Sequence, residues 1–134
     1  PHNLGHASRV VSVSHGEIPR WVRELDWGLQ IMGTSRAKAA SMPTKFAEFI
    51  ASGVRPIHHG CNDEVTSWVE RCGTGYNLPD LSDAALDSCA THIATSASSP
   101  EERASARSRL ESHFSLDAAS RQYQALYNTI LRDD

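Results

Sequence analysis

The sequence predicts an α/β fold in which helices cover both faces of a mostly parallel sheet of about four strands. Short apolar runs alternate along the chain with segments in which apolar residues recur at helical spacing. Within these runs the apolar residues are continuous, which is typical of strands buried on both faces. After about residue 80 the pattern is helical only. We therefore expect a Rossmann-like three-layer sandwich followed by a helical C-terminal extension.

Length and composition predict a single domain over residues 1–134. A chain of 134 residues can bury a core without disulfides or a structural metal. Hydrophobic residues at 40% and charged residues at 22% fit a globular protein. The net charge of −3 excludes a highly basic nucleic-acid binder, so no nucleic-acid partner is expected. No apolar stretch is long enough to cross a bilayer.

Cysteine usage and the first residues predict a cytoplasmic location. Cys61, Cys72 and Cys89 are an odd number at wide spacings, which is typical of free thiols in a reducing compartment. The opening stretch Pro1–His6 lacks the charged and apolar regions of a signal peptide and has no initiating Met. We interpret this stretch as a trimmed or internal start.

The first expected elements are a strand, a helix and a second strand. Val10–Val13 is a β-branched run closed by the loop Ser14–Gly16, the pattern of a buried strand. Apolar residues at helical spacing predict a helix over Ile18–Leu25, with Pro19 at an early position that tolerates proline. Trp27–Met32 is the second expected strand.

A polar loop and an amphipathic helix are expected next. The loop, Gly33–Ser41, is rich in small residues and carries Arg36 and Lys38. Pro43 then opens a helix. Its apolar face is formed by Phe46, Phe49, Ile50 and Gly53, and its polar face by Ser41, Lys45, Glu48 and Ser52.

Two more strands are expected on either side of the next helix. Val54–His58 is the third strand, and Gly73–Leu78 is a weaker fourth strand between glycines. Asn62 or Asp63 caps the helix between them. The apolar stripe of that helix is formed by Val65, Trp68, Val69 and Cys72.

The rest of the chain is predicted to be helical. An apolar stripe over Leu86–Ile93 predicts one helix. Ser99 and Glu102 have capping-box spacing, with Pro100 at the first helical position, so the helical extension should cover about residues 100–134. The segment from Leu116 carries one apolar stripe that should pack against another surface. This stripe is formed by Ala119, Tyr123, Leu126, Tyr127 and Ile130.

Parallel sheets bind ligands beyond the carboxyl ends of their strands, often at a helix N-terminus. The loops 14–16, 33–44 and 58–63 are therefore the candidate sites. His58 and His59 either line the ligand cleft at these carboxyl ends or lie on the surface. The spacing of His58, His59 and Cys61 fits no common metal site, and no Ser–His–Asp arrangement can be argued. We predict no metal and no nucleophilic hydrolysis.

The stretch Pro43–Ile57 opens with Pro-Thr-Lys-Phe-Ala-Glu-Phe-Ile-Ala-Ser-Gly and continues as a short apolar strand. It resembles the C-terminal domain of GT-B glycosyltransferases of the family 4 type, which often read Pro-Ser/Thr-Lys-aliphatic-aromatic-Glu-aromatic-Leu-Ala-small-Gly here. The resemblance covers the chain from about Ser8, and Pro43–Gly53 is its most specific part. Flanking parts that resemble the same domain are Ile18–Pro19, Glu24–Leu29, Gly60–Leu78 and Phe114–Tyr127.

The resemblance implies a retaining enzyme that transfers a sugar from a nucleoside diphosphate sugar to an acceptor, with no metal ion and no cofactor. The helix start near Thr44 and Lys45 would hold the diphosphate, because free N–H groups and the Lys45 charge attract anions. Glu48 matches the glutamate that holds the ribose hydroxyls in the family. His15 lies in the loop that relatives place near the nucleotide base. The alternatives are a solvated surface for Lys45 and Glu48, and loop capping for His15.

Two departures from the family pattern matter. Many relatives carry a glutamate that orients the donor sugar where this chain has Ala40. Arg36 and Lys38 contact phosphate or sugar in its place, or belong to a mobile surface loop. The first two strand–helix units of the family's domain, and the acceptor-binding domain before them, have no counterpart here. We therefore expect a donor-domain fragment with little or no turnover.

The lost units would lie inside the sheet, which predicts either a rearranged four-stranded sheet or a homodimer that covers the exposed edges. The full-length enzyme would be peripheral to the inner membrane. Two other functions stay open. A nucleotide-sugar epimerase would convert the sugar nucleotide without an acceptor. A non-catalytic interaction module would use the apolar stripe from Leu116 to Ile130 as its docking face.

Overall fold

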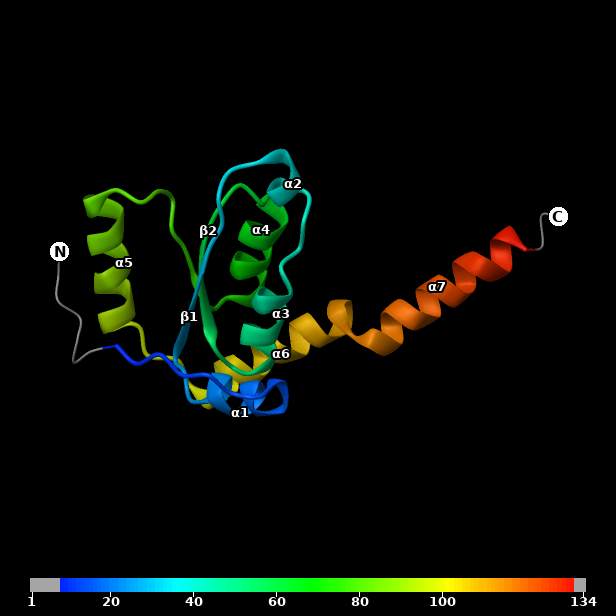
Figure 1. The fold of residues 1–134 in the computed structure, drawn as a ribbon, viewed down its shortest axis with the longest axis horizontal. Coiled ribbons are helices and arrows are strands. Elements are labelled where there is room, and N and C mark those ends of the chain that lie inside the picture. Colours follow the sequence, from blue (N-terminus) through cyan, green and yellow to red (C-terminus); the bar gives the residue numbers. More distant parts are fainter. Residues whose placement is uncertain (1–7, 132–134) are drawn as a thin grey trace.

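The computed structural model describes residues 8–131, which form an α/β fold with a parallel sheet (Figure 1). The strands are β1 (Trp27–Ile31), β2 (Arg55–His59) and β3 (Tyr76–Asn77). The helices are η1 (His15–Glu17), α1 (Ile18–Arg23), α2 (Arg36–Ala39), α3 (Thr44–Ala51), α4 (Asp63–Cys72), α5 (Asp83–Thr95), α6 (Pro100–Phe114) and α7 (Leu116–Ile130).

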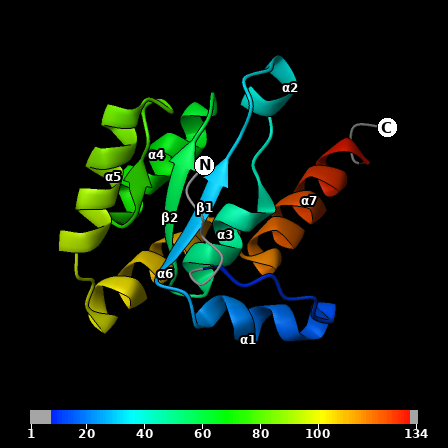
Figure 2. The same ribbon diagram turned by 60° about the vertical axis from the view of Figure 1, so that its left-hand side comes forward.

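The sheet has the order β1-β2-β3, and both strand pairs are parallel. Trp27 is opposite Arg55 at the start of the first pair, and His58 is opposite Asn77 in the second. Parallel neighbours need crossover connections, which α3 and α4 provide. The carboxyl ends of β1 and β2 and the short helix α2 lie at one end of the molecule. Helices η1 and α1 lie at the opposite end, near the start of β1 (Figures 1 and 2).

The prediction of four strands is wrong for the described residues, since 8–131 contain three. Val10–Val13 has no regular secondary structure, and Val10 is fully exposed. Apolar β-branched residues favour a strand only where a neighbouring strand pairs with them and a layer covers them, and this segment gains neither. A rearranged four-stranded sheet is therefore not formed within these residues. The homodimer stays a prediction.

The fourth expected strand is shorter than predicted, because its glycines adopt positive φ angles. Gly73 has a φ of 66° and ends α4 as its C-cap. Gly75 has a φ of 111°, which breaks the extended conformation just before Tyr76. Only Tyr76 and Asn77 then pair with β2.

Helices lie on both sides of the sheet (Figure 2), but the predicted covering of both faces is incomplete, because Leu29 and Ile31 of β1 are 62% and 49% exposed. Helix α3 approaches β1 so closely that a Cβ on Gly28 would lie 2.6 Å from the Phe49 ring. On the other face, Ile57 packs in one cluster with Ala85 and Cys89 of α5. Alternate residues of the strands thus face different helices.

The larger core lies between α3, α4 and α6, on the side of α3 and α4 remote from α5. Helix α6 begins with the predicted capping box, in which Glu102 Oε2 accepts the Ser99 N–H at 2.9 Å and Ser99 Oγ accepts the Glu102 N–H at 3.2 Å. Because its residues Ala106 and Leu110 are buried there, α6 belongs to this core rather than standing apart from it. The buried residues of this core are Phe46, Ile50, Val65, Trp68, Val69, Cys72, Ala106 and Leu110.

Helix α7 continues from α6 and extends away from the sheet (Figure 1). Its apolar stripe was expected to pack against another surface, but Tyr123, Leu126, Tyr127 and Ile130 are all exposed. The amphipathic pattern therefore formed a helix, but within residues 8–131 no other element covers its apolar stripe. Among residues 8–131, no helix has the length and apolar character needed to span a membrane.

Candidate functional site

The polar face of α3 is the first candidate site. Phe46 and Ile50 are buried at 0% and 1% exposure, and they hold one side of the helix in the core. Thr44, Lys45 and Glu48 are exposed on the polar side. Because 3.6 residues make one turn, Glu48 lies about 4.5 Å further along the helix axis than Lys45. The structure thus brings these three residues onto one open surface.

The first turn of α3 presents unpaired backbone donors. Its N-cap is Pro43, which has no side-chain group to cap the helix. The Phe46 N–H donates to the Pro43 carbonyl at 3.1 Å. The N–H groups of Thr44 and Lys45 have no hydrogen-bond partner within residues 8–131. These free donors and the adjacent Lys45 charge make this helix start favourable for anions.

The loop before α3 contains the short helix α2, where the sequence predicted a loop only. Ser35 is its cap, since Ser35 Oγ accepts the Lys38 N–H at 3.2 Å. The predicted residues Arg36 and Lys38 are exposed on this helix. In the described part of the chain, no hydrogen bond or ion pair joins their side chains to Thr44, Lys45 or Glu48. The loop between α2 and α3 separates them from the start of α3.

Asn62 positions this loop, a role that sequence reasoning missed. The sequence predicted Asn62 or Asp63 as the cap of α4, and Asn62 is the cap: its Oδ1 accepts the Val65 N–H at 2.9 Å. Its Nδ2 donates to the Ser41 carbonyl at 2.8 Å and to the Lys38 carbonyl at 3.4 Å. Because Asn62 is buried, this one side chain ties the segment between α2 and α3 to α4. An aspartate at the cap would lack the donor that holds the loop.

The structure does not bring His15 to this site. His15 begins η1, which lies at the end of the molecule near the start of β1 (Figure 1). The prediction depended on a strand at Val10–Val13 whose carboxyl end would carry the loop, and that strand is absent from the described residues. His59 does lie at the carboxyl end of β2, where its Nδ1 is 3.0 Å from the Leu78 carbonyl.

A buried polar cluster lies at the carboxyl ends of β1 and β2. His58 is 1% exposed, and Gln30 Nε2 lies 3.4 Å from both His58 Nδ1 and Met32 Sδ. With Gln30 as the donor, His58 Nδ1 must accept, so the imidazole is neutral and carries its proton on Nε2. Burial, and secondarily the nearby His59, lower the pKa of His58. A protonated His58 would carry an uncompensated buried charge.

We expect the free energy of unfolding to decrease as the pH falls below about 6.5, the ordinary pKa of histidine. The unfolded chain then protonates residue 58, whereas folded His58 stays neutral until its own lower pKa is reached. The unfolded state therefore binds more protons across this window, and stability decreases by at most about 1.4 kcal/mol per pH unit. Urea unfolding from pH 7.5 to 5.0 measures this slope.

The matched variant for this measurement is His58→Gln, which keeps a polar side chain and removes the titrating group. All other histidines are retained, so the difference between the two slopes isolates His58. Equal slopes for both proteins would contradict this reading of the buried cluster.

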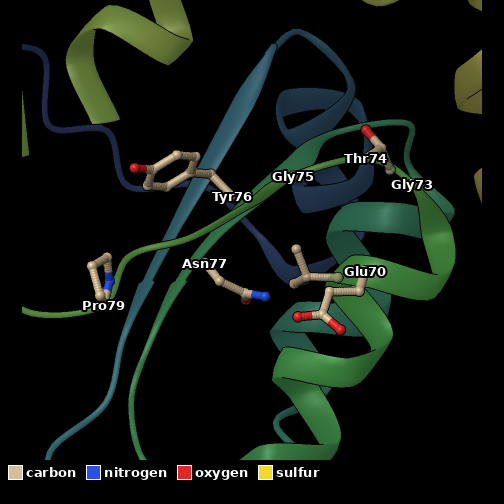
Figure 3. A pocket seen from close by; sticks show the side chains of 8 residues that line it. Glu70, Gly73, Thr74, Gly75, Tyr76, Asn77 and Pro79 are labelled. Atoms are coloured by element: carbon tan, nitrogen blue, oxygen red, sulfur yellow. The ribbon is translucent and has the colours of Figure 1, made fainter. Parts of the chain in front are cut away.

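A hollow of about 450 Å³ lies away from the α3 surface. It flanks the free edge of β3, between Glu70 at the end of α4 and Pro79 (Figure 3). Asn77 in its wall donates from Nδ2 to the Thr66 carbonyl at 3.1 Å. Glu70 is the one charged side chain among its lining residues. A hollow with only a negative charge is unfavourable for a diphosphate, so the α3 surface is the better candidate.

Two of the three free thiols, Cys72 and Cys89, are buried. Burial raises the pKa of both Cys72 and Cys89, which keeps these thiols protonated near neutral pH. Within residues 8–131, no group of three or more His, Cys, Asp or Glu side chains is close enough to hold a metal ion.

Comparison of the whole chain with protein-family models, curated proteins and solved structures gives no match.

Proposed function

We propose that this chain is the donor-binding domain of a retaining GT-B glycosyltransferase and binds a nucleoside diphosphate sugar at the start of α3. The observation that supports the proposal most directly is that free N–H groups and Lys45 lie together at that start. Glu48 lies one turn further along the same exposed face. The resemblance of Pro43–Gly53 to the family motif suggests the same ligand.

In this proposal each residue type matches one part of the donor. The diphosphate oxygens accept hydrogen bonds from the Thr44 and Lys45 N–H groups and from the Thr44 hydroxyl. The Lys45 ammonium stabilises the negative charge that develops on the leaving diphosphate. Glu48 accepts hydrogen bonds from the ribose hydroxyls. Arg36 and Lys38 add positive charge on the same side of the sheet, which attracts the donor.

The open geometry of the α3 surface fits a binding domain better than a complete active site. Thr44, Lys45 and Glu48 line none of the hollows described above and are exposed. A glycosyl transfer needs a site closed to water around the reacting carbon. We therefore propose that a further, acceptor-binding domain closes over this surface and that the chain alone has little or no turnover.

Calorimetric titration with UDP, GDP and ADP tests the proposal. One nucleotide should bind with a Kd of about 1 mM or lower. Lys45→Ala removes a charge-assisted contact of about 1.5–3 kcal/mol, so it should weaken binding roughly tenfold or more. Glu48→Ala should also weaken it, and should weaken binding of inorganic diphosphate much less because that ligand has no ribose.

Arg121→Ala and Glu111→Ala are the matched controls, since they remove one charge of each sign from exposed positions on α7 and α6. Neither should change nucleotide affinity. Equal loss in the controls and the site variants, or binding of no nucleotide, would overturn the proposal. The interaction module, which uses the exposed stripe of α7, would then be the better hypothesis. Conversion of a sugar nucleotide without an acceptor would instead identify an epimerase.

A further inference from the structure

Helix α7 carries a row of apolar residues at the spacing of a coiled coil. The successive intervals are three, four, three and four residues, which is the heptad repeat over two heptads. Four of the five members of the row are more than half exposed, and the fifth, Ala119, is half-buried. We call this row the α7 seam; its members are Leu116, Ala119, Tyr123, Leu126 and Ile130.

A hollow in the α7 seam has the form of the hole that a coiled coil uses. It has a volume of about 230 Å³ and is lined by four residues of α7: Ala119, Gln122, Tyr123 and Leu126. Their positions are i, i+3, i+4 and i+7. In a coiled coil, four residues of one helix form the hole that receives one side chain of the facing helix. The surface of α7 is therefore shaped for a second helix.

The charges on α7 lie away from the seam. Between Leu116 and Ile130 the charged residues are Asp117 and Arg121, and neither is a member of the seam or a direct flank of it. The residues that flank the seam on both sides are uncharged; they are Ser120, Gln122, Tyr127 and Thr129. Two copies of this helix can therefore meet without repulsion between like charges, whereas a charged partner helix would find no counter-charge beside the seam.

An antiparallel arrangement of two copies fits the shape of the molecule. Helix α7 extends away from the sheet (Figure 1), so antiparallel pairing places the two sheets at opposite ends of the pair. With a twofold axis between positions 124 and 125, Tyr123 faces Leu126 of the second copy, and Ala119 faces Ile130. A small residue then faces a large one, which lets the layers interdigitate. The antiparallel helix dipoles also attract each other.

We propose that two copies of this chain associate through their α7 seams as an antiparallel pair of helices. The contact is isologous, because the same residues of both copies form it. The exposed parts of the seam and of Tyr127 offer roughly 500–600 Å² on each copy, so a pair buries roughly 1,000–1,200 Å², near the lower limit for a specific interface. The dimer is therefore weak and is dissociated at the low micromolar concentrations at which unfolding is measured.

Sedimentation equilibrium of the full chain, from about 10 µM to about 1 mM, tests the proposal. The average mass should rise from monomer towards dimer, with a Kd of the order of 100 µM. Leu126→Glu should raise the Kd at least about tenfold, because it places a carboxylate against Tyr123 of the second copy. Asn128→Glu is the matched control, since it adds the same charge on the opposite face of α7 and should leave the Kd unchanged.

A charge exchange between two variants tests the antiparallel register. Ala119→Lys and Ile130→Glu should each raise the Kd at least about tenfold, because each puts a charge into an apolar layer. An equal mixture of the two variants should associate again, since one layer of the mixed pair holds a lysine opposite a glutamate. Parallel pairing would place residue 119 opposite residue 119, and the mixture would then stay dissociated.

Three outcomes would overturn the proposal. The first is a chain that stays monomeric at every concentration, which would leave α7 free for a different partner. The second is an equal effect of Leu126→Glu and Asn128→Glu, or a mixture of Ala119→Lys and Ile130→Glu that does not associate. The third is association that survives Leu126→Glu but is lost in Leu29→Lys, which would place the contact on the exposed residues of β1. Circular dichroism checks that each variant keeps its helices.

Discussion

Replacing Gly75 with alanine is expected to lower the free energy of unfolding by about 3 kcal/mol or more. Gly75 has a φ of 111°, a backbone conformation that side chains with a Cβ rarely adopt. An added Cβ would also lie 2.6 Å from the Pro56 carbonyl oxygen, a backbone atom of the central strand. The clash can be relieved only by moving β3 away from β2, which breaks their pairing. Urea unfolding followed by circular dichroism measures the change.

Gly33→Ala is the matched control for Gly75→Ala. A Cβ on Gly33 would meet no atom within 4 Å, and Gly33 does not have a positive φ. The control should change stability by no more than about 0.5 kcal/mol. If Gly75→Ala is as stable as Gly33→Ala, the close packing of residue 75 on β2 is incorrect.

Replacing Phe46 with alanine is expected to lower the free energy of unfolding by about 3–5 kcal/mol. The Phe46 side chain is completely buried, and it packs with α4 and α6 in the larger core. Its removal loses the free energy of burying an aromatic ring and leaves a cavity between three helices. Because small domains are stable by only about 5–15 kcal/mol, this variant should lose a large part of its stability. Thermal and urea unfolding measure the loss.

Tyr123→Ala on α7 is the comparison for Phe46→Ala, since Tyr123 is a similar aromatic residue at 64% exposure. Its replacement should change stability by no more than about 0.5 kcal/mol. A similar loss at both positions would mean that α7 packs on the body of the protein in solution, contrary to the structure.

The α-helices other than the short α2 were predicted well because their signals are local. Pro43 and the stripe at Phe46 and Ile50 predicted α3, and its observed bounds are Thr44–Ala51. Ser99 predicted the start of α6, including both hydrogen bonds of the capping box. These features depend on residues three or four positions apart, so the sequence contains all of the relevant information.

The strands were predicted less well because they depend on distant partners. The range Trp27–Met32 contains β1, and the range Val54–His58 overlaps β2 in all but its last residue, His59. The run Val10–Val13 has equally strong strand propensity but no neighbour to pair with, and it stays without regular structure.

Among the site residues, the exposure of Lys45 and Glu48 could be predicted from the polar face of α3. The loop contact of Asn62 could not, because its partners Lys38 and Ser41 lie more than twenty residues away.

The α/β class and the polar face of α3, with Thr44, Lys45 and Glu48, follow from local sequence patterns. Three features depend on the folded chain: the sheet has three strands within the described residues, η1 lies away from the α3 surface, and Arg55 is buried at the start of β2. The difference comes from the range of the interactions. Helical periodicity and caps act within one turn, whereas strand pairing and the burial of a charge depend on segments that meet only when the chain folds.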